Sequence, residues 1–310
     1  MKKLTLIDAN AIIHKAFYAL PELTNRKGEQ INAVYGFSSI LLKVINELKP
    51  DYMAAAYDLA EPTFRHKEYK GYKATRVKKP DELIEQIPKT KEILKGFNIP
   101  VLEKKSFEAD DIIGTIAKKF TNKRIEILIL TGDLDTLQLI DKNIKVYSLR
   151  RGMTDTMIYG EKEVLQRYEL KPEQMVDYKG LRGDPSDNIP GIVGVGEKTA
   201  ITLLKEFKTI ENLYNKIEKI SKKQIQEHKF LTEKLVEKIK KSKKMAFFSK
   251  KLATIREDVP IELSLKDLDW KKEFDIGRAK QVFEQFHFKS LIKRLPGYQP
   301  EPKAEQVNLF

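Results

Sequence analysis

Short apolar runs alternate with amphipathic helical patterns over about the first 150 residues. Buried strands are predicted at 4–8 (LTLID), 53–58 (MAAAYD) and 125–133 (IEILILTGD). Helices are predicted at 33–48, 83–96 and 111–120. Strands that alternate with helices in this way are typical of an α/β domain built around a mostly parallel sheet flanked by helices.

The remainder of the chain has a different pattern. From about residue 161 onward it is mostly helical, with a Gly/Pro-rich interruption at 183–196 and a shorter helix near 275–287. The last residues contain three prolines and few apolar positions. We therefore expect three parts: an α/β domain over 1–160, a helical region over 161–293 and an extended tail over 294–310.

Each of the three predicted strands leads into an aspartate: Asp8, Asp58 and Asp133. Parallel strands bring their carboxyl ends to one edge of a sheet, where α/β proteins place ligands. The helix that returns to the third strand must begin at that same edge. Its first residues include Glu108, Asp110 and Asp111.

One aspartate alone would indicate no more than a helix cap or a turn. Many carboxylates at one edge repel one another, and a helix dipole offsets only about 0.3–1 kcal/mol per charge. Two divalent cations would neutralise them, in the arrangement that carries out in-line phosphoryl displacement. The chain has no cysteine and four scattered histidines, so carboxylates would hold the metal, which favours Mg²⁺ or Mn²⁺.

The net charge of +13 is concentrated in two segments. Residues 61–79 carry seven Lys or Arg and two Glu, and residues 216–251 carry thirteen Lys and four Glu. Positive charge gathered in patches indicates a polyanionic partner, although a lysine-rich surface that only aids solubility gives the same count. No apolar run reaches the length of a membrane span, and the first residues lack a signal-peptide pattern, so we expect a cytoplasmic, nucleoid-associated protein with no membrane partner.

The stretch RGDPSDNIPGIVGVGEKTAITLLKEF, at 182–207, carries a second acidic pair, Asp184 and Asp187. A glycine hairpin follows and opens a helix; its candidate DNA-contacting residues are Gly194, Gly196, Lys198 and Thr199. A phosphate-binding P-loop is excluded because Glu197 stands where that motif requires lysine. The pattern favours a helix–hairpin–helix over about 180–207, which holds a nucleic-acid backbone through amide groups, and a plain structural turn is the alternative.

Five motifs, IDAN, AAYD, FEADDIIGT, TGDLDTLQL and GDPSDNIPGIVGVGEKTA, together resemble the 5′-nuclease (flap endonuclease) superfamily, most closely the N-terminal 5′→3′ exonuclease domain of bacterial DNA polymerase I. The resemblance runs from about residue 3 to 293. It implies a PIN-like, Rossmann-like fold, a helical arch at about 61–97 and a helix–hairpin–helix, often with bound K⁺.

The resemblance also implies roles for individual residues. Ligands of a first cation would be Asp8, Asp58, Glu108, Asp110 and Asp111, and ligands of a second would be Asp133, Asp135, Asp184 and Asp187. Catalytic groups would be Asp8, Asp58, Asp110 and Asp133, with Lys73 and Arg76 on one face of an arch helix as a phosphate clamp. Tyr72 would stack on an unpaired base. Lys15 stands where relatives usually have arginine, which removes a bidentate phosphate contact.

The chain ends without a polymerase domain, so we expect either a fragment or a stand-alone nuclease, and the tail favours the stand-alone nuclease. Its last residues, QVNLF, resemble the peptide by which bacterial replication proteins bind the sliding clamp. Gln306 would anchor this peptide, and Leu309 and Phe310 would enter an apolar pocket. A chance match of so short a motif is the alternative.

We therefore predict a monomeric, metal-dependent 5′→3′ exonuclease and flap endonuclease that removes 5′ flaps and RNA primers during DNA replication and repair. Its partners would be flap, nicked or gapped DNA and primer–DNA junctions. Two other classes stay open: a non-catalytic DNA-binding replication accessory that uses the same basic patches, and a PIN-like ribonuclease that shares the acidic site.

Overall fold

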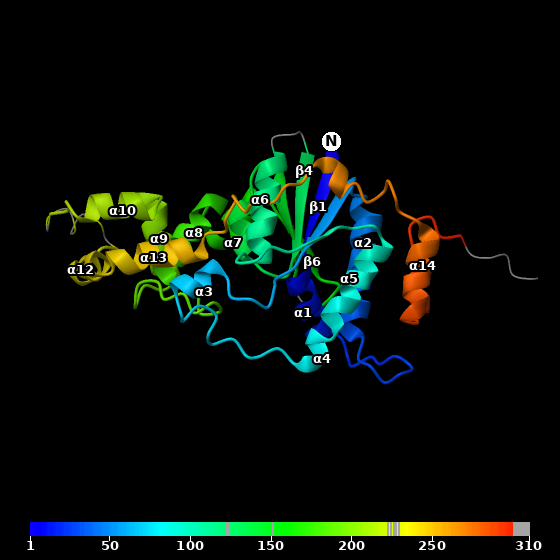
Figure 1. Ribbon diagram of the computed structural model, residues 1–310. Helices are drawn as coiled ribbons and strands as arrows, with labels where there is room; N and C mark the ends of the chain where they lie inside the picture. Colours follow the sequence, from blue (N-terminus) through cyan, green and yellow to red (C-terminus); the bar gives the residue numbers. More distant parts are fainter. Residues whose placement is uncertain are drawn as a thin grey trace, which may run out of the picture.

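The computed structural model describes residues 1–121, 125–150, 152–221, 223, 225, 228 and 230–299. A central sheet carries helices on both faces, and a lobe of helices extends from one side of it (Figure 1). The sequence prediction of an α/β domain followed by a helical region is confirmed.

The sheet has six strands in the order β3-β2-β1-β4-β5-β6, in which the first five are parallel and β6 is antiparallel. The strands are β1 (Lys2–Asp8), β2 (Tyr52–Ala56), β3 (Val101–Leu102), β4 (Ile125–Thr131), β5 (Ile144–Leu149) and β6 (Thr156–Tyr159). The predicted strands correspond to β1, β2 and β4, which are the central, almost continuously apolar ones. The sequence pattern missed β3 because it is only two residues long, and it missed β5 and β6, which lie toward the edge of the sheet.

Helices from both ends of the chain cover one face of the sheet. They are α1 (Ala9–Ala19), α2 (Asn32–Leu48), α4 (Asp81–Ile84), α5 (Gln86–Gly96), α14 (Ile276–Gln285) and α15 (Lys289–Ile292). The opposite face packs against α6 (Ala109–Thr121), whose buried side includes Ile112, Ile116 and Phe120. Apolar side chains alternate along each central strand, so Leu4 and Leu6 face α6 while Ile7 faces the other layer.

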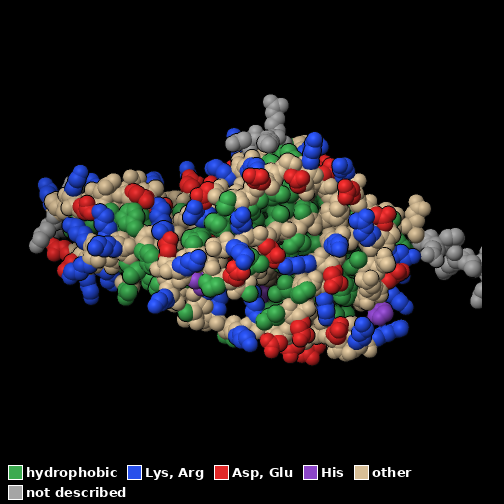
Figure 2. All heavy atoms as spheres, in the orientation of Figure 1, with side chains coloured by type: hydrophobic (Ala, Val, Ile, Leu, Met, Phe, Trp, Pro, Cys, Tyr) green, Lys and Arg blue, Asp and Glu red, His purple; other side chains and the backbone are tan. Residues whose placement is uncertain are grey.

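The helical lobe contains α7 (Glu161–Tyr168), α8 (Met175–Arg182), α9 (Glu197–Phe207), α10 (Ile210–Ile217), α12 (Glu233–Lys241) and α13 (Lys243–Ala253). It is continuous with the core on the α6 face of the sheet through residues such as Leu181, Leu203 and Ile239. Short 3-10 helices lie at Asp135–Leu139 (η1), Pro172–Gln174 (η2) and Leu265–Leu268 (η3). Lysine and arginine side chains are dense over the outer part of this lobe (Figure 2).

The last two helices do not belong to the helical lobe, although the sequence division placed them there. Helix α14 packs on α5, and α15 packs on α2. Phe283 and Leu291 are fully buried in the core of the sheet's other face. After α13 the chain therefore crosses the molecule and forms α14 on the far side of the sheet from the helical lobe (Figure 1).

The basic segment between β2 and α5 forms only one short helix, α3 (Phe64–Glu68), before α4. The prediction that Lys73 and Arg76 lie on one face of a helix is wrong: residues 70–75 form turns, and Lys73 has a φ of 55°.

Among the described residues, no helix combines the length and apolar character needed to span a bilayer.

Candidate active site

The parallel strands bring aspartates to their common carboxyl edge, as expected from the sequence. Asp8 ends β1 and caps α1: its Oδ1 accepts a hydrogen bond from the Ala11 amide at 3.1 Å. Its Oδ2 accepts from Oγ1 of Thr131, the last residue of β4, at 2.7 Å. Asp58 follows β2 and accepts from the amide of Ala109, the first residue of α6, at 2.8 Å. The ends of three strands and one helix thus meet here.

Asp110 lies at the middle of this meeting point, in the first turn of α6. Its Oδ1 is buried and has no hydrogen-bond partner among the described residues. Burial, together with the charges of neighbouring aspartates, raises the pKa of Asp110 well above its ordinary value. We call these five residues the carboxylate centre: Asp8, Asp58, Asp110, Asp133 and Asp135.

Two other members of the carboxylate centre also hold protons more tightly than usual. Burial raises the pKa of Asp8 to about 7; the hydrogen bond from Thr131 opposes this, and the charges of Asp58 and Asp133 add to it. Burial likewise raises the pKa of Asp135 to about 7, with Lys179 opposing the shift. Shifts of this kind are typical of functional sites, because a purely structural cluster would rarely accumulate so much repulsion.

Asp133 and Asp135 are held by the turn that follows β4. The Asp133 amide donates to Thr131 Oγ1, and the Asp135 amide donates to Asp133 Oδ1, both at 2.9 Å. Asp135 is linked to Asp184 by Lys179, a residue of α8 that sequence reasoning missed. The Lys179 ammonium contacts Asp135 Oδ1 and lies 2.7 Å from Asp184 Oδ2. Burial alone would raise the pKa of Asp184, but Lys179 and Ser186 together lower it below its ordinary value.

Glu108 and Asp187 form a second acidic group with residues of the basic segment. The Tyr72 hydroxyl lies 3.0 Å from both Glu108 Oε2 and Asp187 Oδ2. Lys73 contacts Glu108 Oε1 at 2.9 Å, and Arg76 contacts Asp187 Oδ1 at 2.5 Å. Burial and the two carboxylates raise the pKa of Tyr72, so it stays protonated and donates.

The stacking role predicted for Tyr72 does not agree with this arrangement. Its side chain is 3% exposed and packs in a small cluster with Ile189 and Leu252. A base could reach its ring only if the basic segment moved. In this structure Tyr72 positions two carboxylates instead.

Asp111 points away from the carboxylate centre and is fully buried. Both of its oxygens bind the guanidinium of Arg65 at 2.8 Å, and they also accept from the amides of Glu108 and Arg256. With all its lone pairs engaged, Asp111 ties α6 to α3 and to the segment after α13. The structure therefore does not support its prediction as a metal ligand. Arg65 is the second residue that sequence reasoning missed, since nothing distinguished it from the other basic residues around it.

The glycine hairpin joins α8 to α9, in the predicted helix–hairpin–helix order. Asp184 and Ile189 pair across its base through two backbone hydrogen bonds of 2.8 Å. Gly194 has a φ of 78°, and any side chain there would collide with the Lys238 ammonium of α12. Gly196 and Lys198 are exposed at the start of α9, and Thr199 is half-buried. A basic helix thus lies directly against the hairpin.

Lys15 lies on α1 near the same edge of the sheet. Its ammonium donates to the Arg150 carbonyl at 2.6 Å, and its stem packs by Gly132.

The predicted clamp-binding residues Gln306, Leu309 and Phe310 lie outside the described residues.

The carboxylate centre has the donor chemistry for hard divalent cations: five carboxylates, one of them with a buried, unpartnered oxygen. As they stand, no three acidic or histidine side chains in the described part of the chain converge closely enough to hold an ion. Binding a cation would therefore require side-chain rotations that bring these carboxylates together, and the charge of the cation would offset their mutual repulsion.

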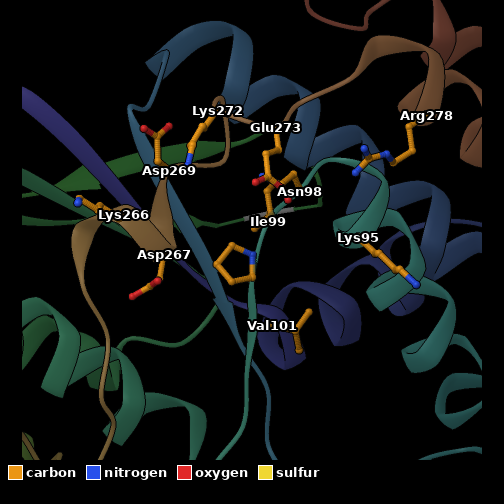
Figure 3. A pocket seen from close by; sticks show the side chains of 11 residues that line it. Lys95, Asn98, Ile99, Val101, Lys266, Asp267, Asp269, Lys272, Glu273 and Arg278 are labelled. Carbon is orange, nitrogen blue, oxygen red and sulfur yellow. The ribbon is translucent and has the colours of Figure 1, made fainter.

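A hollow of about 670 Å³ lies at the opposite end of the sheet, between the residues that precede β3 and the segment 266–278. Acidic and basic side chains alternate around it, with Asp269 beside Lys272 (Figure 3). It contains no member of the carboxylate centre.

Comparison with known families agrees with this geometry. Residues 3–169 match the family model described as "5'-3' exonuclease, N-terminal resolvase-like domain", and residues 170–275 match "5'-3' exonuclease, C-terminal SAM fold". The chain belongs to the 5′-3′ exonuclease family. This membership confirms that it is a nuclease, as the resemblance of its motifs implied.

Two relatives illustrate the range of this exonuclease family. The chain is 37% identical to a 5′-3′ exonuclease of Aquifex aeolicus over 95% of its own length and 96% of that protein. It is 43% identical to DNA polymerase I of Bacillus subtilis over 98% of its own length but only 33% of that protein. The chain thus spans about a third of the length of this polymerase.

Solved structures share the exonuclease fold at low sequence identity. The T5 D15 protein, co-crystallised with metal ions, superposes with a TM-score of 0.66 at 16% identity and covers 94% of this chain and 99% of its own. The catalytic core of Rad2 in complex with a DNA substrate superposes with a TM-score of 0.58 at 18% identity, covering 95% of this chain and 93% of its own. These similarities establish the fold.

Proposed function

We propose that this exonuclease hydrolyses phosphodiester bonds of DNA at 5′ ends and 5′ flaps, with divalent cations bound at the carboxylate centre. The observation that carries the proposal is the buried Oδ1 of Asp110, which has no hydrogen-bond partner in the described part of the chain and is surrounded by aspartates from three parallel strands. An acidic site flanked by Lys73 and Arg76 fits a reaction at phosphate rather than at a carbonyl.

Asp8, Asp58, Asp110, Asp133 and Asp135 would hold the cations, and we favour Mg²⁺ or Mn²⁺ because every donor is a carboxylate oxygen. Bound cations would activate water and neutralise charge on the reacting phosphate. The T5 D15 protein, of the same fold, was crystallised with metal ions, and T5 5′-exonuclease with zinc, which supports divalent cations here. Asp184 would orient Asp135 through Lys179, which binds both. Glu108 and Asp187 stay predicted metal ligands, and each would have to exchange its present basic partner, Lys73 or Arg76, for a cation.

Lys73 and Arg76 would meet the scissile phosphate. Both now bind carboxylates, and Arg76 has a half-exposed side chain, so it can exchange Asp187 for a phosphate with little rearrangement. Both stay cationic: the nearby Glu108 and Asp187 raise the pKa of Lys73 against the effect of burial, and Asp187 does the same for Arg76.

The hairpin and α12 would hold the DNA backbone without reading its sequence. Exposed glycines at the start of α9 leave amide groups open to a phosphate, and Lys238 adds a cation beside them. Structures of T5 flap endonuclease and of Rad2 contain DNA, which supports DNA as the substrate. A K⁺ ion at this hairpin is part of the proposal and is supported by the family resemblance alone.

The remaining parts of the proposal rest on sequence. We propose that the protein acts as a monomer in the cytoplasm, trims flaps and RNA primers in replication and repair, and binds the sliding clamp through Gln306, Leu309 and Phe310. The polymerase I relatives support a place in replication. Deleting 306–310 should abolish clamp binding while leaving flap cleavage intact.

Labelled 5′-flap duplex incubated with Mg²⁺ tests the proposal. Wild type should cleave it, Asp110→Asn and Asp133→Asn should lose at least about 100-fold in rate, and Asp269→Asn, at the opposite end of the sheet, should match wild type. Wild type that binds the flap without cutting it would indicate the non-catalytic accessory. Cleavage of single-stranded RNA in preference to the flap would indicate the PIN-like ribonuclease.

A further inference from the structure

A second hollow, of about 640 Å³, adjoins the carboxylate centre. It lies at the carboxyl ends of β4 and β5, and its wall includes Gly132 and Leu134, the two residues that flank Asp133. Asp133 therefore belongs to the carboxylate centre while its neighbours in the chain line the hollow. We call this space the basic hollow, because three cationic side chains line it.

Three cationic side chains line the basic hollow from three separate elements. Lys15 comes from α1, Arg150 follows β5, and Arg167 comes from α7. None of the three forms an ion pair within 4 Å among the described residues. Elements this far apart in the sequence thus bring unpaired positive charge to one space.

The contacts that these cations do make are to neutral groups. The Lys15 ammonium donates to a backbone carbonyl, the Arg150 guanidinium lies 3.8 Å from the Met157 sulfur, and Arg167 donates to the Tyr159 hydroxyl. The single acidic residue of the lining, Glu163, accepts from the Gly160 amide at 2.8 Å and caps α7. The basic hollow therefore has excess positive charge.

This charge pattern is the reverse of that in the neighbouring site. At the carboxylate centre and beside it, Lys73, Arg76 and Lys179 are each bound to carboxylates. A polyanionic strand whose reacting phosphate enters the centre brings its next phosphates close to unneutralised aspartates. Unpaired arginines alongside give one of those phosphates a favourable place, and a guanidinium can bind it through two parallel hydrogen bonds.

We propose that the basic hollow binds a backbone phosphate of the DNA next to the reacting one and so fixes which phosphodiester enters the carboxylate centre. This inference rests on the proposed function, because it takes DNA as the substrate. Arg150 and Arg167 are the residues that carry it, with Lys15 closing the side toward α1. These residues fix the position of the DNA strand through its phosphates and do not contact base edges, so the effect is independent of the DNA sequence.

A neutral-linkage scan tests the proposal. Flap duplexes are made with a single methylphosphonate, which has no charge, at each linkage within three nucleotides of the cleaved bond. Dissociation constants are measured in EDTA by fluorescence anisotropy for wild type, Arg150→Gln and the double variant Arg150→Gln/Arg167→Gln. Arg150 is exposed, and its side-chain contact with the Met157 sulfur is also exposed, so its single variant should fold even if the double variant does not.

Wild type should lose about 5- to 20-fold in affinity at one particular linkage. The variants should bind the unmodified flap more weakly and show no further loss at that linkage. For these variants, the slope of log binding constant against log salt concentration should be smaller in magnitude by about 1, because the protein no longer neutralises one phosphate of the flap. In Mg²⁺ they should also cut at shifted positions. Arg278→Gln, which removes an arginine from the hollow at the opposite end of the sheet, should match wild type in every assay.

Variants that show the same loss as wild type at every linkage would overturn the inference while leaving the proposed function intact. Wild type that neither binds nor cuts the unmodified flap would overturn the proposed function and this inference with it.

Discussion

The Lys179 ammonium lies 2.7 Å from Asp184 Oδ2 and also contacts Asp135 Oδ1, so one cation from α8 joins the turn after β4 to the glycine hairpin. These are the two parts of the chain that would handle the reaction and the duplex respectively. Lys179 therefore fixes their relative position. The two carboxylates in turn raise the pKa of Lys179, against the effect of burial, and keep it charged.

Replacing Lys179 with methionine should destabilise the protein by about 3 kcal/mol in EDTA, because it leaves two partly buried carboxylates without a cation. Urea denaturation measures this, and added Mg²⁺ should recover part of the loss. Lys241→Met removes an exposed ion pair with Glu237 and should leave the urea midpoint close to that of wild type, because exposed ion pairs contribute little to stability. Equal effects of the two substitutions would contradict the structural role of Lys179.

Asp110→Asn should make the metal-free protein more stable at pH 8, while it abolishes cleavage. The pKa of Asp110 is raised in the folded state, so its ionised form is disfavoured there, and a neutral group of the same size removes that penalty. Thermal unfolding in EDTA measures the gain. If the variant is instead less stable, the Asp110 carboxylate must be stabilised by an interaction that is not among those described for it.

The stability of the metal-free protein should fall as pH rises from about 5 to 8. Asp8 and Asp135 have pKa values of about 7 in the folded state, against about 3.9 for an unfolded aspartate. Between these values the folded state binds more protons than the unfolded state, so this contribution to stability is present below pH 4 and is lost as pH rises through 7.

Thermal unfolding in EDTA across that range is the measurement. The slope should flatten in Asp8→Asn/Asp135→Asn and also in wild type with saturating Mg²⁺, because a bound cation replaces the protons. A slope that is identical in wild type and the double variant would place the titrating groups elsewhere.

Asp111→Asn should behave as a structural change. Asp111 neutralises the buried Arg65, so the substitution should lower stability by about 3–5 kcal/mol. The affinity for Mn²⁺, followed by the decrease in free-ion electron paramagnetic resonance signal, should change by less than threefold in protein that remains folded. A loss of Mn²⁺ affinity as large as that of Asp110→Asn would instead support the ligand role predicted from sequence.

Sequence alone was sufficient for the parts of the site that depend on strand direction. Asp8, Asp58 and Asp133 each follow an apolar run, and parallel pairing then requires them to meet. The helix predicted at 111–120 is α6, which begins two residues earlier than predicted, at Ala109, directly after Glu108.

The roles of Asp111 and Tyr72 could not be predicted, because they depend on partners distant in sequence. Arg65 lies 46 residues before Asp111, and the amide of Arg256 that also binds this aspartate lies 145 residues after it. Tyr72 bridges Glu108 and Asp187, which local patterns place in separate elements. The packing of α14 on α5 is undetectable for the same reason, since both helices are simply amphipathic.

Single-turnover cleavage of a 5′-flap duplex, in Mg²⁺ and in EDTA with both product ends analysed, is the decisive measurement of metal-dependent hydrolysis at the carboxylate centre. We expect cleavage only in Mg²⁺, a 5′-phosphate and a 3′-hydroxyl on the products, and no cleavage by Asp110→Asn under either condition. Cleavage that persists in EDTA, or that survives the loss of the Asp110 carboxylate, would contradict this expectation.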